Sequence, residues 1–209
     1  RRISMEESKF KSGVFGISRG AGVRVISGNK TGYAYTDEIT EEKLKRAAEV
    51  ASFVARGTTP VKPVDITKTE TKRQSFVSVK LPLQDVADSK RIDVMKRANQ
   101  AALDYSDKIK QVYVSYYDEI RGRIIANSEG LYLHDELPLL FFIVQTMGVG
   151  NGTRHMGRER LSMHSGFEMF DQVTPEEVAR TCARESVVML DAKDCPAGKM
   201  DIVMQNGWG

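Results

Sequence analysis

The stretch KQVYVSYYDEIRGRIIANSEGLYLHDELPLLFFIVQTMG, Lys110 to Gly148, decides the fold class. Val112, Val114 and Tyr116 alternate with more polar neighbours, which predicts a half-buried strand that GRIIAN continues. NSEG, residues 127–130, is typical of a tight hairpin turn. The runs LYLHDE and LPLLFFIVQTMG then predict further strands. The centre of the chain is therefore expected to be an antiparallel sheet.

The sequence before this stretch predicts three or four short antiparallel strands and a first helix. RISMEESKF, GVFGISR, AGVRVISG and TGYAYT are the alternating runs, and SGNKTG, Ser27–Gly32, predicts the turn between the last two. Thr40 is the expected start of the helix, with Glu41 and Glu42 in its first turn, where carboxylates suit the helix dipole. Gly57 is expected to end it.

A second helix is expected from about Ser89 to Tyr105, after QSFVSVKLP, Gln74–Pro82, which fits either a short strand or an extended arm. Its polar face is expected to hold SKR, KR and NQ, a set that includes Arg91 and Asn99. Helical spacing predicts an apolar stripe formed by Ile92, Met95, Ala98, Ala102 and Tyr105.

VTPEEVARTCARESVVMLDA, Val173–Ala192, gives the clearest helix start. Thr174 is the cap, Pro175 takes the first helical position and Glu177 completes a capping box. KMDIVMQ, Lys199–Gln205, is then expected to be a strand. The order of strands, helices, strands, helix and strand predicts an α+β fold with mainly antiparallel sheets and about three helices packed against them. The buried stripe of the third helix is expected to hold Ala179, Cys182, Ala183, Ser186, Met189 and Leu190.

Composition narrows the functional classes. The chain has 209 residues, of which 28% are charged and 41% hydrophobic, which is typical of a soluble globular protein. The run Leu137–Met147 is too short to span a bilayer, so no membrane contact is expected. Basic residues number 31 and acidic ones 28, interspersed along the chain, which disfavours a nucleic-acid partner. Two cysteines and no signal peptide indicate the cytoplasm.

No metal site is expected within the chain. The three histidines, His134, His155 and His164, lack the helical spacing that lets two side chains bind one zinc ion. Cys182 lies on the apolar stripe of the third helix, where a buried small hydrophobe is the simpler interpretation. Cys195 has no histidine nearby in sequence. No catalytic or cofactor-binding residue is therefore assigned.

The glycine-rich stretch GVGNGTRHMG, Gly148–Gly157, allows two interpretations. Gly150 and Gly152 would let the backbone approach a ligand closely, while Arg154 and His155 could meet a peptide carboxylate, which makes a substrate-side loop. The stretch lies between two predicted strands and lacks the helix start of a phosphate-binding loop. The tip of a long hairpin is therefore the simpler alternative.

Three stretches, quoted in chain order, resemble the TldD/PmbA family. The first is SRGAGVRVISGNKTGYAYTDEITEEKLKRAAEVA, Ser18–Ala51, the second is SYYDEIRGRIIANSEGLYLHDELPLL, Ser115–Leu140, and the third is PAGKMDIVMQNGWG, Pro196–Gly209. The resemblance identifies residues 1–209 as an amino-terminal domain that is truncated at both ends. It also implies that Gly207, Trp208 and Gly209 lead into a zinc-binding helix of the TldD branch, with the motif H-E-x-x-x-H lying beyond Gly209.

The resemblance further implies a cytoplasmic zinc-dependent peptidase of a family also named as modulators of DNA gyrase. A peptide substrate, zinc in the full-length protein and a homo- or heterodimer with a homologous subunit are expected. The fragment alone is expected to be inactive, because catalytic and metal residues would lie after it. An alternative is a non-catalytic module, a metal-free homologue that binds a peptide or a partner. A nucleic-acid protein is a third, weaker alternative.

Overall fold

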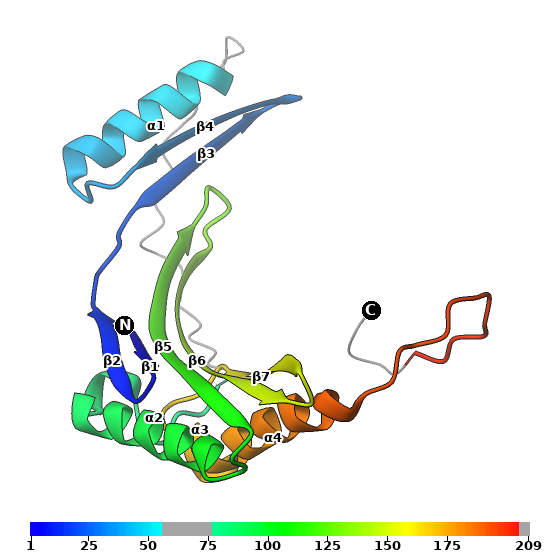
Figure 1. Ribbon diagram of the computed structural model, residues 1–209. Helices are drawn as coiled ribbons and strands as arrows, with labels where there is room; N and C mark the ends of the chain where they lie inside the picture. The colour runs from blue at the N-terminus through cyan, green and yellow to red at the C-terminus, as the bar shows by residue number, and fades with distance from the viewer. Residues whose placement is uncertain (56–76, 205–209) are drawn as a thin grey trace. The chain divides into compact units, whose positions relative to one another are not determined.

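The computed structural model describes residues 1–55 and 77–204 (Figure 1). The α+β prediction is confirmed, since the strand pairs β1 with β5, β3 with β4 and β6 with β7 are all antiparallel and helices pack on the sheets. The elements, including two short 3₁₀ turns labelled η, are β1 (Arg2–Glu6), β2 (Lys9–Val14), β3 (Ala21–Ser27), β4 (Lys30–Thr36), α1 (Glu41–Ala55), η2 (Leu83–Asp85), α2 (Asp88–Leu103), β5 (Ile109–Ala126), β6 (Tyr132–Gly150), β7 (Thr153–Met163), α3 (Met169–Gln172), α4 (Pro175–Val188) and η3 (Met189–Asp191).

The chain forms two compact units. Unit 1 comprises Arg1, Gly13–Ser78 and Glu119–Pro138, and unit 2 comprises Arg2–Ser12, Val79–Asp118 and Leu139–Gly209. The long strands β5 and β6 contribute residues to both units.

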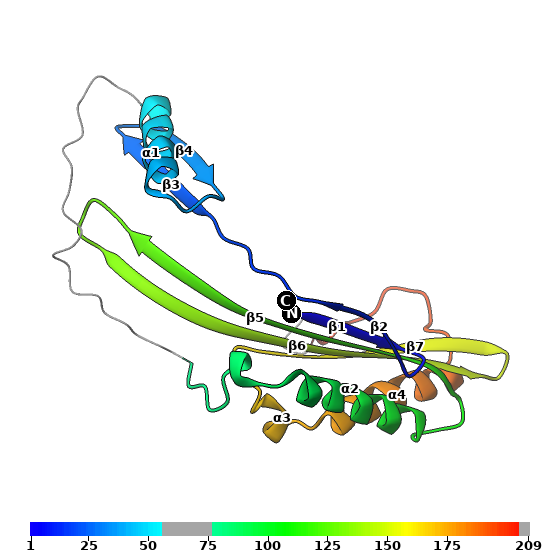
Figure 2. The same ribbon diagram turned by 90° about the vertical axis from the view of Figure 1, so that its left-hand side faces the viewer.

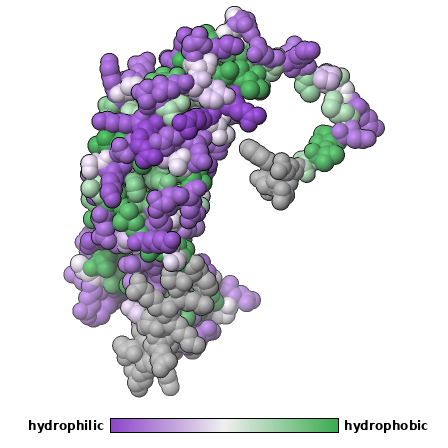
Figure 3. All heavy atoms as spheres, turned by 90° about the horizontal axis from the view of Figure 1, so that it is seen from below, coloured by the Kyte–Doolittle hydropathy of each residue, from purple (hydrophilic) through white to green (hydrophobic). Residues whose placement is uncertain are grey.

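Unit 2 is built on a five-stranded sheet with the strand order β2-β1-β5-β6-β7. Helices α2, α3 and α4 lie on one face of this sheet (Figures 1 and 2). Because side chains alternate between the faces of a strand, every second residue is buried over residues 112–118 of β5 and 138–148 of β6. On the side facing away from the sheet, the surface carries hydrophilic residues with smaller hydrophobic patches between them (Figure 3). The core strand residues include Val112, Val114, Tyr116, Leu140, Phe142 and Val144.

Unit 1 contains the β3–β4 hairpin with α1 packed on it. The predicted turn lies at Gly28, whose φ is +55°, and Thr40 starts the helix as predicted, its Oγ1 accepting a hydrogen bond from the amide of Lys43 at 3.3 Å. The predicted 127–130 turn between β5 and β6 is also confirmed. There Asn127 Oδ1 accepts hydrogen bonds from the amides of Glu129 and Leu131, at 3.1 and 2.9 Å.

Helix α4 has the predicted capping box, with Thr174 and Glu177 each bonded to the other's backbone amide. Helix α2 also lies where it was predicted, and most of its predicted polar face is exposed. Two residues of that face, Arg91 and Asn99, are buried instead, and Tyr105, assigned to the apolar stripe, is 41% exposed. Met189, predicted on the buried stripe of the third helix, lies in η3 after α4 and is likewise exposed. The four-residue α3 was not predicted, because it is too short to show helical periodicity.

Two strand predictions near the amino terminus are corrected. RISMEESKF forms β1 and the start of β2, with a turn at Glu7 and Ser8, whose φ values are 49° and 61°. This turn was missed because glutamate and serine rarely adopt positive φ. In GVFGISR only Gly13 and Val14 belong to a strand, and residues 15–19 pair with no strand in the described part of the chain.

The predicted strand over Lys199–Gln205 is wrong for residues 199–204, while Gln205 lies outside the described residues. A strand needs a neighbour to bond its amides and carbonyls, and Val203 is 99% exposed. For Gln74–Pro82, the strand alternative is wrong over residues 77–82, which form an arm with bends at Lys80 and Leu81. The amide of Phe167 donates to the carbonyl of Leu81 in this arm at 2.9 Å. Residues 74–76 lie outside the described part.

Gly157 sets how closely α4 approaches β7. A Cβ added there would stand 2.2 Å from the carbonyl oxygen of Cys182 on α4. The side chain of Thr146 reinforces this approach, since its Oγ1 donates to the same carbonyl at 3.1 Å. The helix backbone therefore rests directly on the sheet.

We expect Gly157→Ala to lower the free energy of unfolding by about 3 kcal/mol, because overpacking must displace backbone rather than a flexible side chain. The control is Gly122→Ala, which meets no atom within 4 Å and should change stability by about 0.5 kcal/mol or less. Urea unfolding of both variants checks this. Equal effects would contradict the packing explanation.

Candidate functional site

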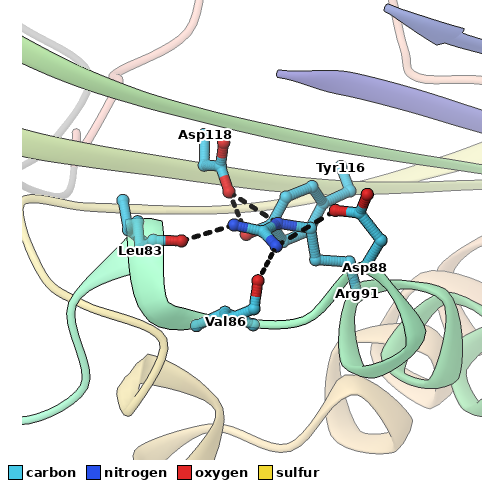
Figure 4. Close-up of polar contacts among 6 residues, drawn as sticks. All are labelled: Leu83, Val86, Asp88, Arg91, Tyr116 and Asp118. Carbon is cyan, nitrogen blue, oxygen red and sulfur yellow. Dashed lines mark hydrogen bonds and ion pairs between the residues drawn. The ribbon is translucent and has the colours of Figure 1, made fainter. Parts of the chain in front are cut away.

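The most extensive buried polar cluster joins Arg91 on α2 to Tyr116 and Asp118 on β5 (Figure 4). Arg91 Nε donates to Asp118 Oδ2 at 2.8 Å, and the Tyr116 hydroxyl donates to the same oxygen at 2.8 Å. Arg91 also donates to the backbone carbonyls of Leu83, at 2.5 Å, and Val86, and to Asp88 Oδ1 at 3.2 Å. Arg91, Tyr116 and Asp118 are 1%, 0% and 5% exposed.

The electrostatics of this cluster favour a structural role. Burial by itself would lower the pKa of Arg91, but the hydrogen bond and charge of Asp118 outweigh it and the pKa is raised. Burial raises the pKa of Tyr116, and the neighbouring Asp118 adds to the increase. Arg91 thus stays charged and Tyr116 stays a hydroxyl donor at neutral pH. Neither group is suited to take up or release a proton for catalysis.

The local sequence explains the geometry. Asp118 lies two residues after Tyr116, so both side chains point to the core face of β5. Arg91 lies in the first turn of α2, next to the two carbonyls that it binds, Leu83 in η2 and Val86 just after it. The alternation of Val112, Val114 and Tyr116 already indicated which face Asp118 would occupy. No local pattern, however, indicated its partner 27 residues earlier.

A second buried carboxylate, Glu168, binds the arm of residues 77–82 that precedes η2. Its oxygens accept hydrogen bonds from the amides of Lys80, Leu81 and Gly166 at 3.1, 2.9 and 3.2 Å, and from the Ser165 hydroxyl at 3.3 Å. Burial would raise the pKa of Glu168, but the backbone hydrogen bonds outweigh it and the pKa is lowered. Glu168 is therefore a charged anchor for the arm.

The predicted substrate-side residues lie at the β6–β7 hairpin. The strands extend further than predicted, so the tip consists only of Asn151 and Gly152, with φ values of 53° and 73°. Gly150 ends β6. Arg154 and His155 are neighbours on β7 and point to opposite faces of the sheet, so the structure does not bring them together. Their contact with substrate remains a prediction.

The described residues offer no ligand set for a metal ion. They contain no group of three or more His, Cys, Asp or Glu side chains placed to hold one. His134 pairs with Glu136 at 4.0 Å. Cys182 is buried as predicted, its Sγ donating to the carbonyl of Val144 at 3.2 Å, and burial raises the pKa of the thiol. Zinc therefore does not fit this part of the chain, and Gly207, Trp208 and Gly209 lie outside it.

Solved structures define the class of the fold. A Thermotoga maritima protein described as a candidate modulator of a DNA gyrase superposes with a TM-score of 0.74 at 16% identity, over 94% of this chain and 44% of its own. TldE from Thermococcus kodakarensis superposes with a TM-score of 0.64 at 15% identity, over 88% of this chain and 41% of its own. The chain therefore shares its fold with less than half of each of these proteins. None of the described helices is long and apolar enough to cross a bilayer.

Sequence comparison then shows the family: the chain belongs to the PmbA/TldD metallopeptidase family. Residues 81–190 match the model described as the PmbA/TldA metallopeptidase central domain, and residues 1–55 match domain 1. The metalloprotease TldD homolog of Haemophilus influenzae is 26% identical over 98% of this chain and 43% of its own length. A metalloprotease of Methanothermobacter thermautotrophicus is 27% identical over 96% and 43%. The chain thus spans less than half the length of these relatives.

We expect Arg91→Met to lower the free energy of unfolding by about 3–5 kcal/mol, because it leaves the buried Asp118 charge without its guanidinium. The matched control on the same helix is Arg97→Met. Arg97 binds Glu176 at 2.6 Å, but its side chain is 44% exposed, so the expected loss is about 1 kcal/mol or less. Urea unfolding measures both. Similar losses would show that burial does not decide the contribution.

The lowered pKa of Glu168 predicts a specific dependence on pH. A carboxylate whose folded pKa lies below its unfolded value contributes stability above the unfolded value, and this contribution is lost as the pH falls through the folded value. Glu168→Gln should therefore flatten the decline in unfolding free energy between about pH 5 and pH 3. Unfolding at several pH values tests this, with Glu129→Gln as the exposed control. An unchanged acid slope would be the contrary result.

Proposed function

We propose that the chain is the amino-terminal part of a TldD-like zinc-dependent peptidase of the cytoplasm, where it shapes the substrate channel and contacts a homologous subunit. The full-length enzyme would hydrolyse peptides and unfolded segments, while residues 1–209 alone would be inactive. The observation that supports this is the match of two family domains over residues 1–55 and 81–190, in relatives named metalloproteases that are more than twice as long.

The division of labour follows from the chemistry of the described residues. Hydrolysis by zinc needs side chains that bind the metal and a base that activates its water. The buried Arg91 and Glu168 are occupied by structural hydrogen bonds, and no metal-ligand group exists among the described residues. Binding and orientation are therefore the roles that this part of the protein can supply.

A metal-free peptide- or partner-binding homologue is the second candidate function. The structural similarity to TldE favours it, because TldD and TldE names occur together among the matches. In that case the chain would bind a peptide or a homologous subunit without any catalytic half of its own.

Reading the gene beyond Gly209 separates the two candidates. The proposal expects the motif H-E-x-x-x-H within about a dozen codons, since histidines one helical turn apart can bind one zinc ion. The longer product should contain zinc by elemental analysis and cleave a fluorogenic peptide, and chelation should abolish cleavage. The 209-residue chain should do neither. A stop codon, or a different sequence there, would favour the metal-free homologue.

A further inference from the structure

The unit 2 sheet has a second face, which points away from α2, α3 and α4 (Figure 2). We call it the open sheet face and define it by the strand residues that alternate with the core. In the strand pairing, Arg2 lies opposite Tyr117 and Phe141 lies opposite Ser162. Because paired residues point to the same face and side chains alternate along a strand, the even-numbered residues of β7 share this face with Phe141. Its arginine and aromatic members include Arg2, Tyr117, Phe141, Arg154, Arg158 and Arg160.

Four of these side chains form a continuous row across β1, β5, β6 and β7. The Arg2 guanidinium lies 5.4 Å from the centroid of the Tyr117 ring. The Tyr117 and Phe141 rings are 5.7 Å apart, and the Arg160 guanidinium lies 4.7 Å from the centroid of Phe141. Each terminal arginine is thus held over an aromatic ring, which orients its charge before any ligand arrives.

The open sheet face is strongly cationic, although the chain as a whole is nearly balanced. Arg154 and Arg158 extend the charge of Arg160 along β7, and all three are exposed. Among the described residues, none of the four arginines of this face forms an ion pair. Along β1, β5, β6 and β7 of unit 2, Glu6 is the acidic residue on this face. The face therefore has excess positive charge.

We propose that the open sheet face binds acidic segments of extended peptide substrates, an inference that rests on the proposed peptidase function. Guanidinium groups bind carboxylates through two parallel hydrogen bonds. Arg154 to Arg160 covers about 20 Å of strand at roughly 3.3 Å per residue, which matches about six residues of an extended peptide. Phe141 and Ile143 lie beside these arginines and would contact apolar residues between the acidic ones.

The same surface is less suited to single-stranded nucleic acid. Proteins that bind single-stranded nucleic acid stack its bases on exposed aromatic rings. Tyr117 and Phe141, in contrast, each have a guanidinium over the ring. The charge of the whole chain is nearly balanced, so the chain does not offer the broad positive surface that phosphate binding requires.

The test uses the 209-residue chain and a fluorescein-labelled decapeptide with glutamate at alternate positions. Fluorescence anisotropy should show binding about tenfold tighter than that of the matched glutamine peptide, and the difference should shrink in salt. Arg158→Gln/Arg160→Gln should weaken binding of the acidic peptide about tenfold. The control Arg184→Gln removes an exposed arginine from α4 and should change it less than twofold.

Equal affinity for the two peptides, or equal weakening by Arg184→Gln, would overturn the inference. So would an oligonucleotide of similar length that displaces the peptide with higher affinity. A second variant, Phe141→Leu, keeps the apolar contact but removes the ring beneath Arg160, and should weaken binding about threefold. Circular dichroism verifies the fold of each variant. A negative result in these binding experiments would not bear on the zinc motif proposed after Gly209 or on peptide hydrolysis by the full-length protein. The two proposals can therefore fail separately.

Discussion

The buried charge of Arg91 is the constraint on which the rest of unit 2 depends. Its guanidinium binds Asp118 on β5, Asp88 on α2 and two carbonyls in and just after η2, and the side chain is 1% exposed. Removing a charge from water costs several kcal/mol unless its partners are all in place. The sheet, the helix and the turn before it must therefore form together, because a partial arrangement leaves the charge unpaired.

Side chains of β5 point alternately to the core and to the open sheet face, so residues that stabilise the fold alternate with residues proposed to bind a ligand. Tyr116 is fully buried and supports Asp118, whereas its neighbour Tyr117 belongs to the open sheet face and lies under Arg2. One residue of register thus decides whether a tyrosine serves the core or the surface. Arginines follow the same division: Arg91 satisfies a buried carboxylate, while Arg158 and Arg160 have no ion-pair partner among the described residues.

The parts of the fold that local patterns encode could be predicted. The two-residue period of β5 and the capping box of Thr174 and Glu177 depend only on neighbours in sequence, and both were predicted correctly. Features that depend on distant partners could not. Arg91 was predicted to be a surface residue because Asp118 is 27 residues away. Residues 199–204 were predicted to be a strand because sequence alone could not show that they pair with no strand among the described residues. The candidate site was limited in the same way, since Arg154 and His155 are adjacent in sequence but point to opposite faces.

These contacts bear on the division of labour proposed between this chain and the rest of the full-length protein. Groups that can hold a metal or move a proton must keep free lone pairs and a pKa near the working pH, yet Tyr116, Cys182 and Glu168 are all committed to buried hydrogen bonds. Burial raises the pKa values of Tyr116 and Cys182, whereas backbone hydrogen bonds outweigh burial and lower the pKa of Glu168. Fixed arginines on an open sheet have the opposite property, because they can bind a carboxylate without any change in protonation. On the proposed function, such a surface would position a substrate, and the hydrolytic residues would lie in the rest of the full-length protein.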